Sequence, residues 1–169
     1  MGYAALNAYV VPGSAISAEA ANVTSAAEAV IRSAENSQVL FGTKRDAISR
    51  LMLLADQCAQ PDWDGAGALA IDVATVQNVE NFVRALPDSI PMPEFAPDPD
   101  GSVSLDWIET PHRMFSLSIG PTNRVAYAWL DGSDRGHAVA RFDDRAVPVR
   151  VLDGVRTTLG MKDAAVRPA

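Results

Sequence analysis

SVSLDWIETPHRMFSLSIGPTNRVAYAWL, residues 102–130, decides the fold of this chain. Apolar and polar side chains alternate within SVSLDWI, again within MFSLSIG and again within RVAYAWL. A period of two with many β-branched and aromatic residues is typical of strands that bury one face. The breaks between these runs are too short to hold a crossover helix, so neighbouring strands are expected to be antiparallel. We therefore predict a meander, which GHAVARF at 136–142 extends by a fourth strand.

Helical patterns flank the predicted strands. Apolar residues recur three and four positions apart in 43–60 and again in 72–86, as in amphipathic helices. Pro148 suits the first turn of a last helix that meets Gly160. The segment at 87–101 holds five prolines and is expected to be an extended connector. The predicted fold class is α+β, with N-terminal helices, an antiparallel meander sheet of four to five strands and a C-terminal helix.

The 169 residues have room for one domain. We place it at 43–162, after an Ala- and Ser-rich segment at 1–42 that is expected to be a partly helical arm, and before a flexible tail at 163–169. No apolar run approaches the roughly 18 to 20 residues of a membrane-spanning helix, and the N-terminus lacks the basic start of a signal peptide. The one cysteine, Cys58, cannot form an internal disulfide. These features predict a cytoplasmic protein without a membrane segment.

Charge is spread unevenly along the chain, whose net charge is −7. Residues 61–112 carry ten acidic side chains against one arginine, whereas residues 113–169 carry six acids and nine bases. One interpretation is mutual attraction of the two halves within the fold. The other is an acidic surface that steers a protein partner with a basic surface, and the predicted partner-binding residues are Asp88, Glu94, Asp98, Asp100, Asp106 and Glu109. Nucleic acid is the less favoured partner, because a dominant basic stripe is lacking.

PDWDGAGALAID, residues 61–72, has features of three kinds of site. A calcium-loop pattern begins at Asp62, but Val73 stands where the closing glutamate belongs. A phosphate-binding loop would need a lysine and a Ser or Thr after its glycines. The favoured interpretation is a structural corner, with the aromatic ring as its buried anchor and the glycines at positive φ. Its residues are Trp63, Asp64, Gly65 and Gly67.

Catalytic and metal-binding patterns are weak. The histidines, His112 and His137, match no metal-ligand spacing, so the sequence predicts no metal and no cofactor. Cys58 continues an apolar helix stripe and is expected to be a core residue. The alternative to a binding protein is a hydrolase-type enzyme with a site between the corner and the sheet, which would use Asp64, Asp106 and one histidine.

The motifs W-D-G-x-G-A and P-D-G-S-x-x-L-x-W carry a resemblance over about residues 60–142. The matching residues are Trp63, Asp64, Gly65, Gly67, Pro99, Asp100, Gly101, Trp107, Tyr127 and Ala128. On these residues the chain resembles a family of uncharacterised bacterial proteins. The resemblance implies one bacterial α+β domain and assigns no catalytic residue. From the acidic composition we expect a small bacterial or mobile-element protein that binds another macromolecule without catalysis, as an antitoxin-like neutraliser or an inhibitor of a host defence system does.

Overall fold

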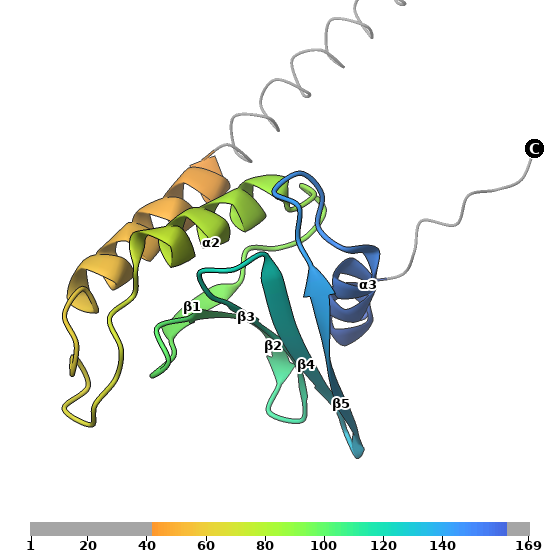
Figure 1. Cartoon of the computed structure of the whole chain (residues 1–169). Helices are drawn as coiled ribbons and strands as arrows, with labels where there is room; N and C mark the ends of the chain where they lie inside the picture. The colour runs from red at the N-terminus through yellow and green to blue at the C-terminus, as the bar shows by residue number, and fades with distance from the viewer. Residues whose placement is uncertain (1–41, 162–169) are drawn as a thin grey trace, which may run out of the picture. The chain divides into compact units, whose positions relative to one another are not determined.

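The computed structural model describes residues 42–161. A helix at 42–57 comes first, followed by α2 (Val73–Ala85). Five strands and a last helix then follow: β1 (Glu94–Pro97), β2 (Val103–Thr110), β3 (Arg113–Ile119), β4 (Arg124–Asp131), β5 (Asp134–Arg141) and α3 (Val149–Thr158). This arrangement (Figure 1) confirms the predicted α+β class. The predicted arm at 1–42, apart from its last residue, and the predicted tail at 163–169 lie outside the described residues.

Each strand pairs with the next in antiparallel fashion, so the sheet order is β1-β2-β3-β4-β5. The predicted meander is thereby confirmed. We expected the Pro-rich segment at 87–101 to be an extended connector, but four of its residues form β1 and pair with β2. Pro97 ends that strand, and β1 lies at the edge of the sheet, where a residue without an N–H group is tolerated.

The sheet has a covered face and an uncovered face, which we call the inner face and the open face. Inner-face side chains such as Leu105, Leu117 and Tyr127 are buried and occupy facing positions on β2, β3 and β4. Their chain neighbours point the other way because side chains alternate along a strand. The open face therefore presents mainly small and polar residues, among them Ser116 and Ala128.

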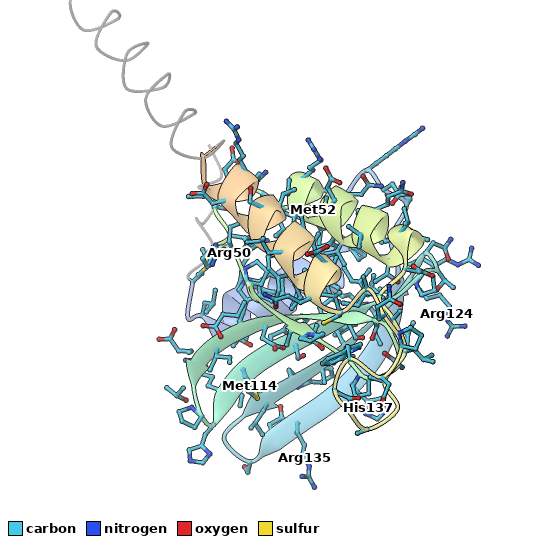
Figure 2. All side chains as sticks on the ribbon, turned by 90° about the vertical axis from the view of Figure 1, so that its left-hand side faces the viewer. Arg50, Met52, Met114, Arg124, Arg135 and His137 are labelled. Atoms are coloured by element: carbon cyan, nitrogen blue, oxygen red, sulfur yellow. The ribbon has the colours of Figure 1, made fainter. Side chains whose placement is uncertain are left out.

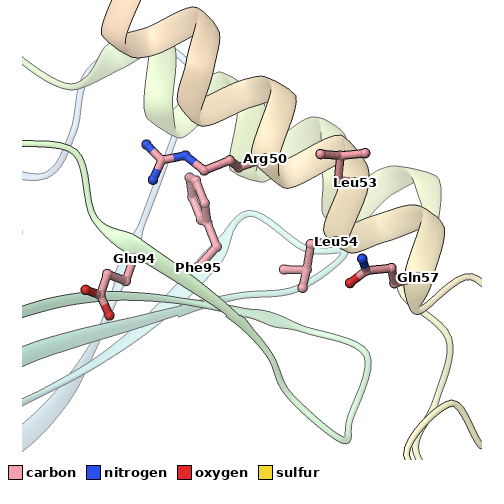
Figure 3. A pocket seen from close by; sticks show the side chains of 6 residues that line it. All are labelled: Arg50, Leu53, Leu54, Gln57, Glu94 and Phe95. Carbon is pink, nitrogen blue, oxygen red and sulfur yellow. The ribbon is translucent and has the colours of Figure 1, made fainter.

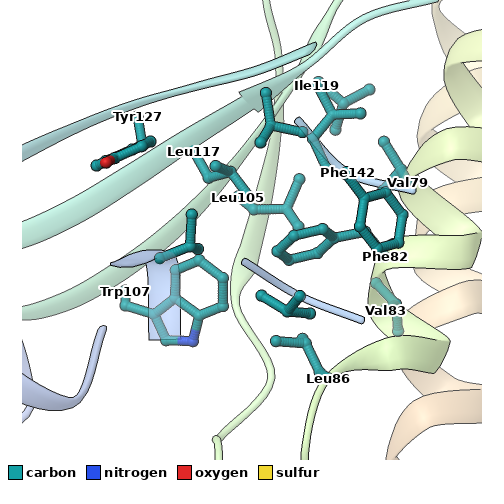
Figure 4. Close-up of a cluster of buried hydrophobic side chains, with 14 of the residues drawn as sticks. Val79, Phe82, Val83, Leu86, Leu105, Trp107, Leu117, Ile119, Tyr127 and Phe142 are labelled. Atoms are coloured by element: carbon teal, nitrogen blue, oxygen red, sulfur yellow. The ribbon is translucent and has the colours of Figure 1, made fainter. Parts of the chain in front are cut away.

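The core lies between the inner face and α2 (Figure 4). Val79, Phe82 and Val83 of α2 are fully buried. Phe82 meets Phe142 edge to face, with ring centroids 5.3 Å apart and an interplanar angle of 68°. Such aromatic pairs contribute about 0.5–1.5 kcal/mol beyond the area they bury. Asp72 caps α2, because its carboxylate accepts a hydrogen bond of 2.6 Å from the Thr75 amide.

Helix α3 approaches the sheet closely at Gly154. A Cβ atom there would lie 2.3 Å from Cε2 of Phe115, a ring that is 1% exposed. Val151 and Val155 of the same helix are fully buried. The glycine therefore sets how near α3 packs to β3.

Gly154→Ala is expected to lower the free energy of unfolding. Overpacking a core costs about 1–3 kcal/mol, and this exceeds the gain of about 1 kcal/mol from replacing glycine in a helix. Urea denaturation followed by circular dichroism measures the change. Gly120→Ala is the control, since its new Cβ would lie 3.8 Å from the nearest atom, Cβ of Ser102. A Gly154→Ala variant more stable than wild type would show that this contact does not limit the packing.

Candidate functional site

The predicted corner is a tight loop closed by aspartates. The Asp64 carboxylate accepts hydrogen bonds from the amides of Ala66 at 2.8 Å and Ala68 at 3.1 Å. Asp62, with φ of 65°, accepts from the Gly67 amide at 2.8 Å. The Ala66 and Ala68 amides hold the pKa of Asp64 below its ordinary value. These carboxylates are thus occupied by the backbone of their own loop.

Both glycines of the corner have positive φ, 70° at Gly65 and 93° at Gly67. Trp63 is only partly buried and packs against the edge of the core, whereas the sequence led us to expect a buried anchor. Its indole N–H donates to the Leu69 carbonyl at 3.0 Å. The Leu69 amide in turn donates to the Pro99 carbonyl at 2.8 Å, which connects the corner to the β1–β2 turn.

The six acidic residues predicted to bind a partner fall into separate groups. Asp88 forms an ion pair with Lys44, with a distance of 3.1 Å between nitrogen and oxygen. Glu109 is exposed near the end of β2, where the pairing with β3 is irregular. Asp98 and Asp100 belong to the β1–β2 turn, and the Asp98 carboxylate lies against the open-face serines Ser104 and Ser118. The remaining two acids also lie on the open face. The sequence segment therefore does not form one continuous acidic surface.

Three serine hydroxyls donate to the Asp98 carboxylate. Ser104 donates at 2.8 Å, Ser102 at 3.0 Å and Ser118 at 3.1 Å. Asp100 accepts from the amide of Ser102 at 3.0 Å and shares the single hydroxyl hydrogen of Ser102, at 2.6 Å, with Asp98. The Ser102 hydroxyl, followed by the amide, lowers the pKa of Asp100. Both aspartates serve mainly to hold the turn between β1 and β2.

Glu94 and Asp106 face each other across β1 and β2 on the open face. Figure 3 shows Glu94 pointing away from the side of β1 that carries Phe95. Among residues 42–161, neither carboxylate forms an ion pair or a hydrogen bond. Like charges directly opposite each other destabilise a sheet. No contact within the described residues therefore explains why both positions are acidic.

A basic row occupies the other edge of the open face. Arg135, His137 and Arg141 occupy alternate positions of β5, and Arg124 faces Arg141 from β4. Arg124 and Arg135 project from the sheet in Figure 2. No ion pair joins this row to any acid in the part of the chain that the structure describes. From the sequence alone, Arg135 and Arg141 are interpreted as part of a solvated face or as partners for the acids, with an anion-binding patch as the less favoured alternative. The row itself was not predicted, although its period of two along a predicted strand was a usable signal.

The residues of the predicted hydrolase-type site do not converge. Asp64 is bound to its own loop, and Asp106 and His137 are three strand spacings apart, which is roughly 14 Å. His112 lies in the turn between β2 and β3. Within residues 42–161 no cluster of three His, Cys, Asp or Glu side chains could hold a metal ion. Cys58 is buried, and burial raises the pKa of its thiol, which disfavours the nucleophilic thiolate.

Two concave sites lie beside the helices. The first is a groove of about 400 Å³ between the helix at 42–57 and β1 (Figure 3), lined by Arg50, Leu53, Leu54, Gln57, Glu94 and Phe95. The second, which we call the α3 cleft, also measures about 400 Å³ and lies between α3 and strands β3 to β5. Phe115, Tyr127 and Trp129 line it. Sequence reasoning missed this cleft, because its lining comes from β3, β4, β5 and α3, which only the tertiary structure brings together.

Comparison of the chain with known protein families, curated proteins and solved structures found no match. In the described residues no helix has the length and apolar character to cross a membrane.

Trp63→Ala is expected to destabilise the protein by roughly 1 to 3 kcal/mol, below the cost of about 3–5 kcal/mol for removing a fully buried aromatic side chain. The loss combines partial burial with the hydrogen bond to Leu69. Urea denaturation measures it, and Trp63→Phe separates the two contributions, because the ring is kept while the N–H is lost. A change below half a kcal/mol for Trp63→Ala would show that the indole does not anchor the loop.

Asp100→Ala is expected to lower the melting temperature at pH 7. This deficit in melting temperature, relative to wild type, is expected to decrease as the pH is lowered. The pKa of Asp100 is held below its ordinary value of 3.8 in the folded state. Its carboxylate therefore contributes stability that is present above the unfolded pKa and is lost as the pH falls through the folded pKa. Melting curves between pH 7 and about pH 2.5 measure this. The exposed Glu109→Ala is the control, and a deficit for Asp100→Ala that is independent of pH would contradict the assignment.

Proposed function

We propose that this protein acts by binding another protein through the open face of its sheet, without catalysis. The observation that carries the proposal is the Glu94–Asp106 pair. Two carboxylates in facing positions repel each other and lower the stability of the free protein. A basic surface on a partner would supply the missing counter-charge. A sequence retains such destabilising groups where function requires them.

The shape of the open face supports protein binding. Its centre carries the small side chains of Ser116, Ala126 and Ala128, over which a partner can approach the backbone. Two exposed apolar side chains add contact area, Ile108 at 49% exposure and Val139 at 52%. Protein interfaces commonly combine such apolar contacts with a polar surround.

The open face is acidic at one edge and basic at the other, and this distribution specifies which charges the partner needs at each edge. The partner must be basic where it meets β1 and β2. Where the partner meets β5, its surface must be acidic or neutral, because Arg135 and Arg141 lie there. Complementary charge of this kind increases the rate of association and orients the partner.

As a biological role we propose an antitoxin-like neutraliser or an inhibitor of a host defence system, since both act by occupying a surface of another protein. The resemblance to uncharacterised bacterial proteins supports a bacterial or mobile-element origin as part of the same proposal. We further propose a cytoplasmic location, supported by the single cysteine, Cys58, which is buried as a free thiol.

The double variant Glu94→Gln, Asp106→Asn tests the proposal by two opposite effects. It removes a repulsion, so the free energy of unfolding is expected to rise by roughly 0.2–1 kcal/mol. It also removes the charge that attracts the partner, so association is expected to be slower and less dependent on salt. A partner captured from host lysate is identified by mass spectrometry and then measured by surface plasmon resonance at two salt concentrations.

The matched control is Asp56→Asn with Asp153→Asn, two exposed aspartates on helices away from the open face. This control has the same net charge as the open-face variant and is expected to associate with the partner at the wild-type rate. If the open-face variant and the control associate with the partner at the same rate, the open face is not the binding surface. A loss of stability in the open-face variant would show that the acidic pair has a structural role instead.

A further inference from the structure

The α3 cleft has an aromatic floor. Phe115 and Tyr127 stack with ring centroids 5.6 Å apart, and Trp129 follows Tyr127 at 6.3 Å. A Cβ atom on Gly136, which faces Trp129 across β4 and β5, would lie 2.2 Å from Cζ2 of the indole. One face of the Trp129 ring therefore rests on the backbone of β5. The ring lines the cleft beside Tyr127 and is only partly buried.

One end of the cleft is acidic. Asp131 and Asp134 line it and face each other at the end of the β4–β5 hairpin. Nε of Arg113 lies 3.5 Å from the Asp131 carboxylate, so that charge is partly neutralised. Asp134 forms no ion pair with any residue in the range 42–161. This end of the cleft therefore keeps an unbalanced carboxylate next to the aromatic rings.

The C-terminus of helix α3 lies at the same end of the cleft. Thr157 and Thr158, at the C-terminus of α3, line the cleft. Arg113 donates to the Thr157 carbonyl at 2.6 Å, which places this helix end beside the Asp131 carboxylate. Arg113 therefore offsets both the partial negative charge of the helix end and part of the Asp131 charge, which leaves Asp134 as the unbalanced charge of this end. Thr158 is 4% exposed, and its hydroxyl has no hydrogen-bond partner among the described residues.

Arg150 is the remaining charged group of the cleft. It lies in the first turn of α3, seven residues before Thr157, which corresponds to roughly 10 Å along the helix axis. Its backbone is therefore at the other end of α3 from Thr157 and Thr158, which lie beside the acidic end of the cleft. The cleft as a whole is polarised, with its cation-attracting end at the hairpin.

We propose that the α3 cleft is a binding site for a small organic cation with an apolar body, such as a quaternary ammonium group. The cation would lie against Trp129 and Tyr127 with Asp134 as its counter-charge. Aromatic faces attract cations, and Trp does so most strongly. A volume of about 400 Å³ is within the range of small-ligand sites. The site is on the inner side of the sheet and does not depend on the protein-binding role of the open face.

Choline and its neutral isostere 3,3-dimethylbutan-1-ol are the probes, titrated into the full chain labelled with ¹⁵N. The Trp129 indole N–H signal, assigned by its disappearance in Trp129→Phe, is expected to shift on addition of choline. Choline is expected to bind about 2- to 30-fold more tightly than the alcohol, which corresponds to the contribution of a cation–π contact. Equal affinity for the two probes would overturn the proposal, as would the absence of any shift at Trp129.

Two variants that change only a charged side chain give a test that does not depend on whether variants of the aromatic residues fold. Asp134 and Arg150 are both exposed, so Asp134→Asn and Arg150→Gln are expected to fold as wild type does. Asp134→Asn should weaken choline binding severalfold and leave the affinity for the alcohol unchanged. Arg150→Gln should leave choline binding equal or stronger. Choline binding that is unaffected by Asp134→Asn, or weakened by Arg150→Gln, would contradict the assigned position of the cation.

Discussion

The aromatic inner face of the sheet is the feature on which the rest of the structure depends. Trp107, Phe115 and Tyr127 follow one another across β2, β3 and β4, with ring centroids 6.2 and 5.6 Å apart. Alternation along the strands places these rings on one side, so the helices must cover that side to exclude water. The opposite side carries small and polar residues and remains open. Both proposed binding surfaces follow from this asymmetry, because α3 covers the aromatic series only in part and no described element covers the open face.

Many of the acidic residues that make the chain negative build its turns. Asp64 and Asp143 accept hydrogen bonds from backbone amides in their own loops, and these bonds lower the pKa of each carboxyl. The hydroxyl of Ser102, followed by its amide, lowers the pKa of Asp100. These carboxylates stay charged, but their oxygens already accept hydrogen bonds from their own loops and are less available to donors of a partner. Glu94 and Asp106 have no such donors within residues 42–161. The net charge of the chain therefore overstates the number of carboxylates whose oxygens are free to contact a partner.

The β4–β5 hairpin contributes to both proposed sites through opposite faces. Arg135 and His137 belong to its open face, whereas Trp129 lies on its inner face above Gly136. Asp131 and Asp134 close the hairpin and line the α3 cleft. The sheet backbone separates the two sites, so a protein on the open face and a small cation in the cleft can be bound at the same time. A hairpin at the edge of the sheet can carry two recognition surfaces in this way because its inner side is covered only by one short helix.

Local patterns in the sequence determined the strands, the helices and the antiparallel order, because hydrophobic periodicity and short turns are properties of neighbouring residues. They also identified the buried Cys58. Strand β1 was missed, since it lies in a proline-rich segment and forms only by pairing with β2. The Glu94–Asp106 pair and the α3 cleft depend on strand register and on the contact of Gly154 with Phe115. Only tertiary structure decides these features, because it brings together residues that are distant in the chain and gives each charge its partner or leaves it without one.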